Sequence, residues 1–68
     1  MPIQVDPADV AGLKWRECVA QRTVEVAGRA EWFYARPADQ PSVVLGFTGG
    51  DRAEFLRRVT DGTFQFDS

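Results

Sequence analysis

Histidine is absent from this 68-residue sequence, and cysteine occurs once, as Cys18. The missing histidine removes both the commonest general base and the commonest metal ligand. A single cysteine permits no internal disulfide, so we interpret Cys18 as a small, half-buried apolar residue. These two shortages lead us to expect no enzyme active site, no structural metal and no cofactor.

Positive charge and long apolar runs are scarce as well. Eight lysine and arginine residues stand against ten aspartate and glutamate residues, so the net charge is −2. A nucleic-acid-binding domain is normally basic, and direct binding of nucleic acid is therefore not expected. No apolar run approaches the roughly 20 residues that cross a bilayer, and the N-terminus lacks the features of a signal peptide. We expect a cytoplasmic protein without membrane contact.

The short chain forms a single domain, residues 1–68, with a small core. Such a core rarely supplies more than about 3–5 kcal/mol of stability. One cysteine forms no internal disulfide, and the lack of histidine argues against a zinc site, so another chain is the favoured source of additional support. We therefore expect a homodimer or a complex with a protein partner.

The most complete set of structural signals lies in the last third of the chain. Thr48 is placed to act as the N-cap of a helix, and Asp51 stands where a capping box has its acidic residue. Gly62 can adopt the left-handed conformation that ends a helix. These signals predict a helix over residues 49–61. Its apolar stripe consists of Phe55, Leu56 and Val59.

Residues 14–47 alternate between apolar and polar types, as strands of an antiparallel meander do. An extended N-terminal arm, residues 1–13, precedes them and contains one helical turn that begins at Asp6-Pro7. Gly28-Arg29 is expected to form a turn. A tail of alternating residues, 63–68, follows the helix. The expected strands cover residues 14–18, 23–27, 31–36 and 43–47.

Together these elements predict an α+β fold. The sheet is a small antiparallel β-meander of three to four strands, and the C-terminal helix packs on one of its faces. Only the apolar stripe of the helix and the apolar strand faces match in period, so we expect them to form one core. The strand residues expected beneath Phe55 and Leu56 are Val24, Val26, Leu45 and Phe47.

Three consecutive aromatic residues, Trp32, Phe33 and Tyr34, occupy the third expected strand. Because neighbouring strand residues face opposite sides, these three rings cannot all enter one core. The second face needs a cover, which the N-terminal arm, the C-terminal tail or a second chain could supply. Exposed aromatic residues of this kind are typical of interfaces. The residues predicted to bind a partner are Trp32, Phe33, Tyr34, Arg52, Phe64 and Phe66.

Arg52 interrupts the apolar stripe of the helix. If Thr48 is the N-cap, Phe47 and Arg52 occupy the two positions that contact each other in a hydrophobic staple. The methylene stem of an arginine can pack on apolar surface while its guanidinium reaches solvent. We predict that Arg52 lies at the edge of the core with its guanidinium over Phe47 or Trp32, available to a carboxylate.

Several short motifs resemble those of a family of very small actinobacterial proteins, the domain of unknown function 397 (BldB-like) family. They cover Trp15 to Asp67, in the order and at nearly the spacing of the family pattern. Where that pattern has a tryptophan in the helix, this sequence has Arg52. The motifs are Trp15-Arg16, Thr-Val-Glu-Val-Ala at 23–27, Val-Leu-Gly-Phe-Thr at 44–48, Ala-Glu-Phe-Leu at 53–56 and Asp-Gly-Thr-Phe at 61–64.

The resemblance implies a regulatory protein rather than an enzyme. Members of this family are thought to bind helix-turn-helix regulators of the WhiJ type and to modulate development or secondary metabolism. We therefore expect a non-enzymatic interaction protein whose partner is a helix-turn-helix transcriptional regulator. The alternatives are a small toxin of a toxin–antitoxin pair and a direct nucleic-acid-binding protein.

Overall fold

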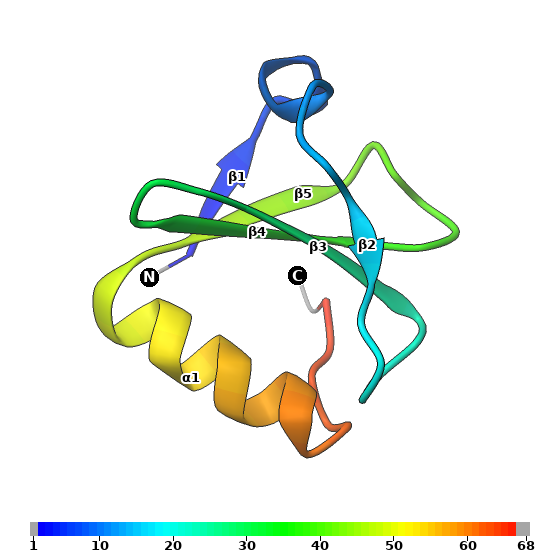
Figure 1. Cartoon of the computed structure of the whole chain (residues 1–68), viewed down its shortest axis with the longest axis vertical. Coiled ribbons are helices and arrows are strands. Elements are labelled where there is room, and N and C mark those ends of the chain that lie inside the picture. Colours follow the sequence, from blue (N-terminus) through cyan, green and yellow to red (C-terminus); the bar gives the residue numbers. More distant parts are fainter. Residues whose placement is uncertain (1, 67–68) are drawn as a thin grey trace.

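Five antiparallel strands and one C-terminal helix form the fold in the computed structural model, which describes residues 2–66. The strand order across the sheet is β1-β5-β4-β3-β2 (Figure 1). The predicted α+β fold, an antiparallel sheet with one helix packed on it, is confirmed. The elements are β1 (Ile3–Val5), a 3₁₀ turn η1 (Pro7–Val10), β2 (Arg16–Glu17), β3 (Val24–Arg29), β4 (Trp32–Pro37), β5 (Val44–Phe47) and α1 (Gly49–Thr60).

The N-terminal arm contributes a strand that the sequence pattern did not predict. Ile3 and Val5 of β1 pair with Gly46 and Val44 of β5, so the sheet has five strands rather than three or four. Three residues are too few for a recognisable alternation of apolar and polar types. This strand forms only by pairing with β5, which is far away in the sequence. The helical turn after it is present, and the Asp6 side chain accepts a hydrogen bond of 2.9 Å from the Ala8 backbone N–H.

The β3–β4 hairpin turns two residues later than predicted. Gly28 and Arg29 belong to β3, and the closing pair of the hairpin is Arg29↔Trp32. Ala30 takes the left-handed conformation in the two-residue turn, with a φ of 54°. Glycine suggested a turn at position 28, but here it lies opposite Phe33. A Cβ on Gly28 would lie 3.4 Å from that ring.

The helix has the predicted position, although one of its capping contacts is absent. Thr48 is the N-cap residue in an extended conformation, but its side chain makes no capping hydrogen bond. Gly49 follows with a φ of 59°, and this left-handed residue changes the geometry that brings a cap hydroxyl to the first N–H groups. At the other end Gly62 has a φ of 74°, and the Thr63 N–H donates to the Arg58 carbonyl at 2.9 Å, as a glycine C-cap requires.

The main core lies between α1 and the sheet. Phe55 is 1% exposed, and its ring lies 4.5 Å from that of Phe47 and 4.7 Å from that of Phe64 between centroids. The prediction that Phe55 and Phe47 share a core is confirmed. Val26 and Leu45 pack against this core and are partly buried, as is Cys18. The buried members are Val24, Ala35, Phe47, Phe55, Val59 and Phe64.

The expectation that Leu56 belongs to this core is wrong. Leu56 is 36% exposed, whereas Phe55 and Val59 are buried. Residues four positions apart lie on one line along a helix, and the line through Phe55 and Val59 faces the sheet. Leu56 is turned by 100° from Phe55 and lies at the margin of the contact.

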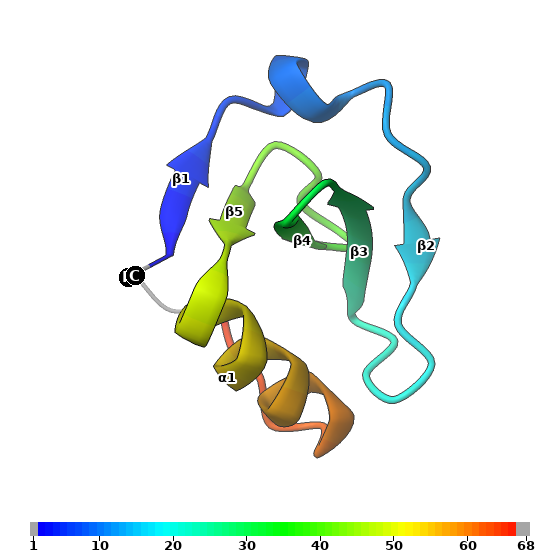
Figure 2. The ribbon, with the colours of Figure 1, turned by 60° about the vertical axis from the view of Figure 1, so that its left-hand side comes forward.

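A second, smaller core lies on the opposite face of the sheet. Its buried residues are Val10, Tyr34 and Val44. Figure 2 shows the segment that carries η1 passing from β1 at one edge of the sheet to β2 at the other, opposite α1. Of the three covers considered for the aromatic strand, the N-terminal segment therefore supplies the one for Tyr34. The partly buried residues around this core are Val5, Leu13, Trp15 and Trp32.

The described part of the C-terminal tail returns to the main core. The Phe64 ring is buried there. The side-chain amide of Gln21 forms hydrogen bonds with both backbone groups of Phe64. The Phe64 N–H donates to Gln21 Oε1 at 3.0 Å, and Gln21 Nε2 donates to the Phe64 carbonyl. Residues 67–68 of the expected tail lie outside the described residues.

Candidate interaction surface

The six residues predicted to bind a partner do not form one surface. Trp32 and Tyr34 lie on the face covered by the N-terminal segment, and their rings are stacked with centroids 6.3 Å apart. Tyr34 is 6% exposed, so it contributes to the second core rather than to a surface. Phe33 points to the opposite face and packs against the main core, with its ring centroid 5.7 Å from that of Phe55.

Arg52 lies over an aromatic ring, but the ring is Phe33. The guanidinium carbon is 5.9 Å from the Phe33 centroid. The two rings that the sequence suggested are both unsuitable, because Phe47 is buried beneath the helix and Trp32 is on the other face. Phe64 is also buried, and Phe66 packs against it at 4.9 Å between centroids. Phe33 and Arg52 are thus the only pair among the six predicted residues that meets near the surface of the described chain.

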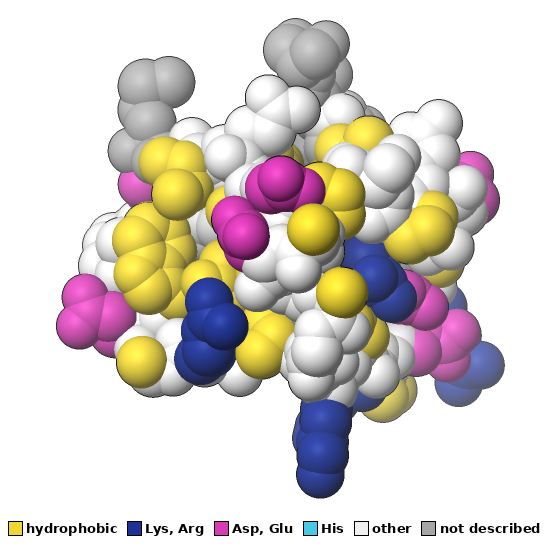
Figure 3. Space-filling view, turned by 90° about the horizontal axis from the view of Figure 1, so that it is seen from above, with side chains coloured by type: hydrophobic (Ala, Val, Ile, Leu, Met, Phe, Trp, Pro, Cys, Tyr) yellow, Lys and Arg dark blue, Asp and Glu magenta, His cyan; other side chains and the backbone are white. Residues whose placement is uncertain are grey.

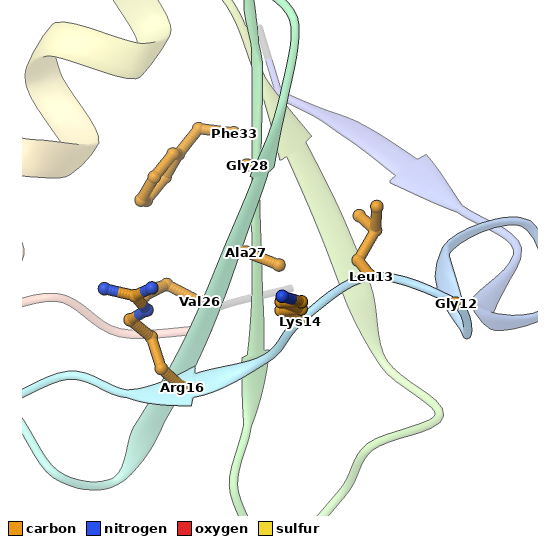
Figure 4. A pocket seen from close by; sticks show the side chains of 8 residues that line it. All are labelled: Gly12, Leu13, Lys14, Arg16, Val26, Ala27, Gly28 and Phe33. Carbon is orange, nitrogen blue, oxygen red and sulfur yellow. The ribbon is translucent and has the colours of Figure 1, made fainter.

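Next to Phe33 the structure contains a groove that the sequence analysis missed. It has a volume of about 530 Å³ and lies between β3 and the segment that leads into β2 (Figure 4). Its origin is the early separation of two strands, since β2 has two residues and β3 has six. The groove is lined by Gly12, Leu13, Lys14, Arg16, Val26, Ala27, Gly28 and Phe33.

The wall formed by β3 presents an open strand edge. The pairing of β2 with β3 ends at Arg16↔Val26. Along a strand, alternate residues direct their backbone groups to opposite sides. The Cys18 N–H donates to the Val24 carbonyl at 2.9 Å. The backbone N–H and C=O groups of Val24, and of every second residue after it, therefore point toward β2. Gly28 belongs to this series, and its N–H and C=O therefore point into the groove beyond the end of the β2 ladder.

The groove is positively charged. Lys14 and Arg16 are exposed, and neither forms an ion pair with another residue in the range 2–66. The lining includes no aspartate or glutamate. By contrast, Arg36 Nε donates to Glu25 Oε1 at 2.7 Å. The guanidinium carbon of Arg36 also lies 4.1 Å from the centroid of the Trp15 ring. The groove cations are thus available to an anion, whereas Arg36 is already held within the fold.

An exposed trio of charged side chains lies on α1, away from the groove. Glu54 accepts from Arg57 Nη2 at 2.8 Å and from Arg58 Nε at 2.7 Å. These side-chain hydrogen bonds lower the pKa of Glu54 from its ordinary value of 4.5 to about 2. Residues three and four apart on a helix are neighbours, so the trio follows directly from the sequence spacing. It stabilises the helix surface and leaves the groove unaffected.

We expect Glu54 to titrate near pH 2 in an NMR titration of its carboxyl carbon. Because its pKa is lower in the folded chain than in the unfolded chain, the trio stabilises the fold at neutral pH. That contribution is lost as the pH falls from about 4.5 through about 2. Replacing both Arg57 and Arg58 by alanine should return the pKa toward 4.5. A midpoint near the ordinary value in the unmodified chain would contradict the contact.

Residues 2–66 contain no group of three or more histidine, cysteine, aspartate or glutamate side chains placed to hold a metal ion. None of the described helices is long and apolar enough to cross a membrane. On the face seen in Figure 3, charged side chains of both signs lie between apolar ones. The groove at β3 is the candidate site because it combines an open strand edge with exposed positive charge.

Comparison of the chain with models of protein families, with curated proteins and with solved structures gives no match. The membership of the BldB-like family that the motifs suggest stays a prediction.

Proposed function

We propose that this chain is a non-enzymatic protein-interaction module whose partner is a helix-turn-helix transcriptional regulator. Through that partner it would modulate the expression of developmental or secondary-metabolism genes. The identity of the partner comes from the resemblance to the BldB-like family. The observation that carries the interaction is the open edge of β3 beside a cationic groove.

An open strand edge supports protein binding for a simple reason. Unpaired N–H and C=O groups can form main-chain hydrogen bonds with an extended segment of another chain. Natural sheets usually protect such edges, and here β2 protects only the first half of β3. The aromatic wall at Phe33, with Arg52 above it, adds apolar contact area and a further positive charge at the same place.

Co-purification from the native host, followed by mass spectrometry, tests this proposal. We expect a helix-turn-helix regulator to elute with the chain, and the two purified proteins to form a stoichiometric complex in size-exclusion chromatography. Failure of the purified pair to associate would contradict the proposal. Salt-dependent DNA binding by the chain alone would instead support a nucleic-acid-binding protein, and growth arrest on its expression alone would support a toxin.

Self-association is the second part of the proposal. The outer edge of β1 is open because β1 is an outermost strand of the sheet, and Ile3 on this strand is 49% exposed. Two copies could pair there without using the groove at the opposite edge. Sedimentation at micromolar concentration should then show twice the chain mass of 7.6 kDa. A single species of 7.6 kDa would contradict self-association and leave the regulator complex to be tested separately.

A further inference from the structure

We propose that the groove at β3 binds the free C-terminus of an extended peptide segment, which adds to the sheet as an antiparallel strand. The carboxylate of that terminus would lie beside Lys14 and Arg16. This inference rests on the proposed function, since it names the part of the partner protein that is bound. Of the six residues predicted to bind a partner, only Phe33 lines this groove.

The shape of the groove requires a chain end. Figure 4 shows β2 meeting β3 near Arg16 and Val26, while the segment through Lys14 and Leu13 diverges from β3 toward Gly12. The groove is thus open beside Gly28 and closed at the Arg16↔Val26 pair. A strand laid along β3 from the open end meets β2 at that pair and cannot continue. A peptide that fills the groove must therefore terminate there.

The charge of the groove selects which end of a peptide it binds. Lys14 and Arg16 attract a carboxylate and repel an ammonium group, and no acidic residue lines the groove. A peptide whose C-terminus lies at the closed end runs opposite to β3, as β2 does. In an antiparallel pair one residue exchanges both backbone hydrogen bonds with the residue opposite. The exposed N–H and C=O of Gly28 provide such a position.

The side walls indicate what the last residues of the peptide should be. Leu13 and Ala27 lie on one side of the β3 ribbon, and Val26 and Phe33 lie on the other (Figure 4). Successive residues of an added strand alternate between these two apolar sides. The volume of about 530 Å³ falls within the range usual for ligand sites. The ligand class is therefore an extended peptide with apolar terminal residues and a free carboxylate.

The test uses the full chain and an array of synthetic, fluorescein-labelled hexapeptides with a free C-terminus, in which the last two residues are varied over all amino acids. We expect peptides with apolar ends to raise fluorescence anisotropy, and the amidated form of the best peptide to bind about tenfold more weakly. Methylation of the backbone nitrogen that faces Gly28 should also abolish binding. Chemical-shift changes should centre on Lys14, Arg16 and Gly28.

A pair of matched variants locates the site. Arg16→Glu should weaken binding of the best peptide by about tenfold or more, because the new carboxylate repels the terminus. Arg22→Glu makes the same charge change at an exposed arginine that does not line the groove, and it should alter binding less than about twofold. NMR spectra of both variants would show that they remain folded.

Three outcomes would overturn the inference. They are equal binding of the acid and amide peptides, unchanged binding after backbone methylation, and no binding by any peptide of the array at millimolar concentration. In each case the purified regulator could still form a complex with the chain, and the proposed function would stand without this site. If instead the peptides bind but no regulator does, the groove is confirmed and the partner class is wrong.

Discussion

Replacement of Phe55 by alanine is expected to unfold the chain under ordinary conditions. Truncating a buried phenylalanine costs about 3–5 kcal/mol, which is as much as a core of this size supplies. The large effect follows from the position of the ring, which is 1% exposed and packs against Phe33, Phe47 and Phe64. Urea denaturation followed by circular dichroism would measure the loss of stability.

Leu56→Ala is the matched control on the same helix. Leu56 neighbours Phe55 in sequence but is 36% exposed, so its truncation should cost no more than about 1 kcal/mol. The two variants share the same helix and the same new residue, and they differ mainly in burial. Equal losses of stability for the two would show that the helix docks through a different line of residues.

Val10→Asp is expected to produce the second large effect. Val10 is 1% exposed between Tyr34 and Val44, so the substitution places a carboxylate in an apolar core without a partner. An uncompensated buried charge typically destabilises a protein by about 3–5 kcal/mol. We expect a much lower melting temperature at pH 7. Part of the loss should be recovered at low pH, because the carboxyl is then protonated and neutral.

The control for Val10→Asp is Ala8→Asp, which introduces the same side chain two residues earlier. Ala8 belongs to η1 as well, but it is exposed. Surface substitutions usually change stability by no more than about 0.5 kcal/mol. A melting temperature that is equally low in both variants would mean that the new charge acts on the 3₁₀ turn itself, and that η1 does not cover a core.

Signals that depend on neighbouring residues were sufficient to predict most of the fold. Gly62 follows the end of the helix as expected. A left-handed glycine C-cap depends only on neighbouring residues, so the sequence is enough to predict it. Alternation around Val24 and Phe47 predicted both strands and the face on which the helix packs. Both Phe55 and Leu56 were expected in the core, and only Leu56 was wrong. A helical stripe of three apolar residues does not show which of them lies at its margin.

Features that depend on distant pairing could not be predicted in the same way. β1 exists because Ile3 reaches Gly46, and three residues carry no readable period. Gly28 suggested a turn, since sequence alone does not show that Phe33 would lie opposite it. The groove results from the point at which β2 separates from β3, and nothing near Lys14 in the sequence marks that point. Five aromatic residues were predicted to bind a partner, but two of them, Tyr34 and Phe64, are buried.

The placement of β1 and β2 at opposite edges of the sheet has a consequence for the order of folding. The meander from β2 to β5 and the helix after it join segments that are consecutive in the chain, so they can form after closing short loops. β1 can pair only when β5 is in place, and this contact closes a loop that spans more than half of the chain. We therefore expect the N-terminal strand to be the last part of the sheet to assemble and the first to open, and each opening would expose the edge of β5.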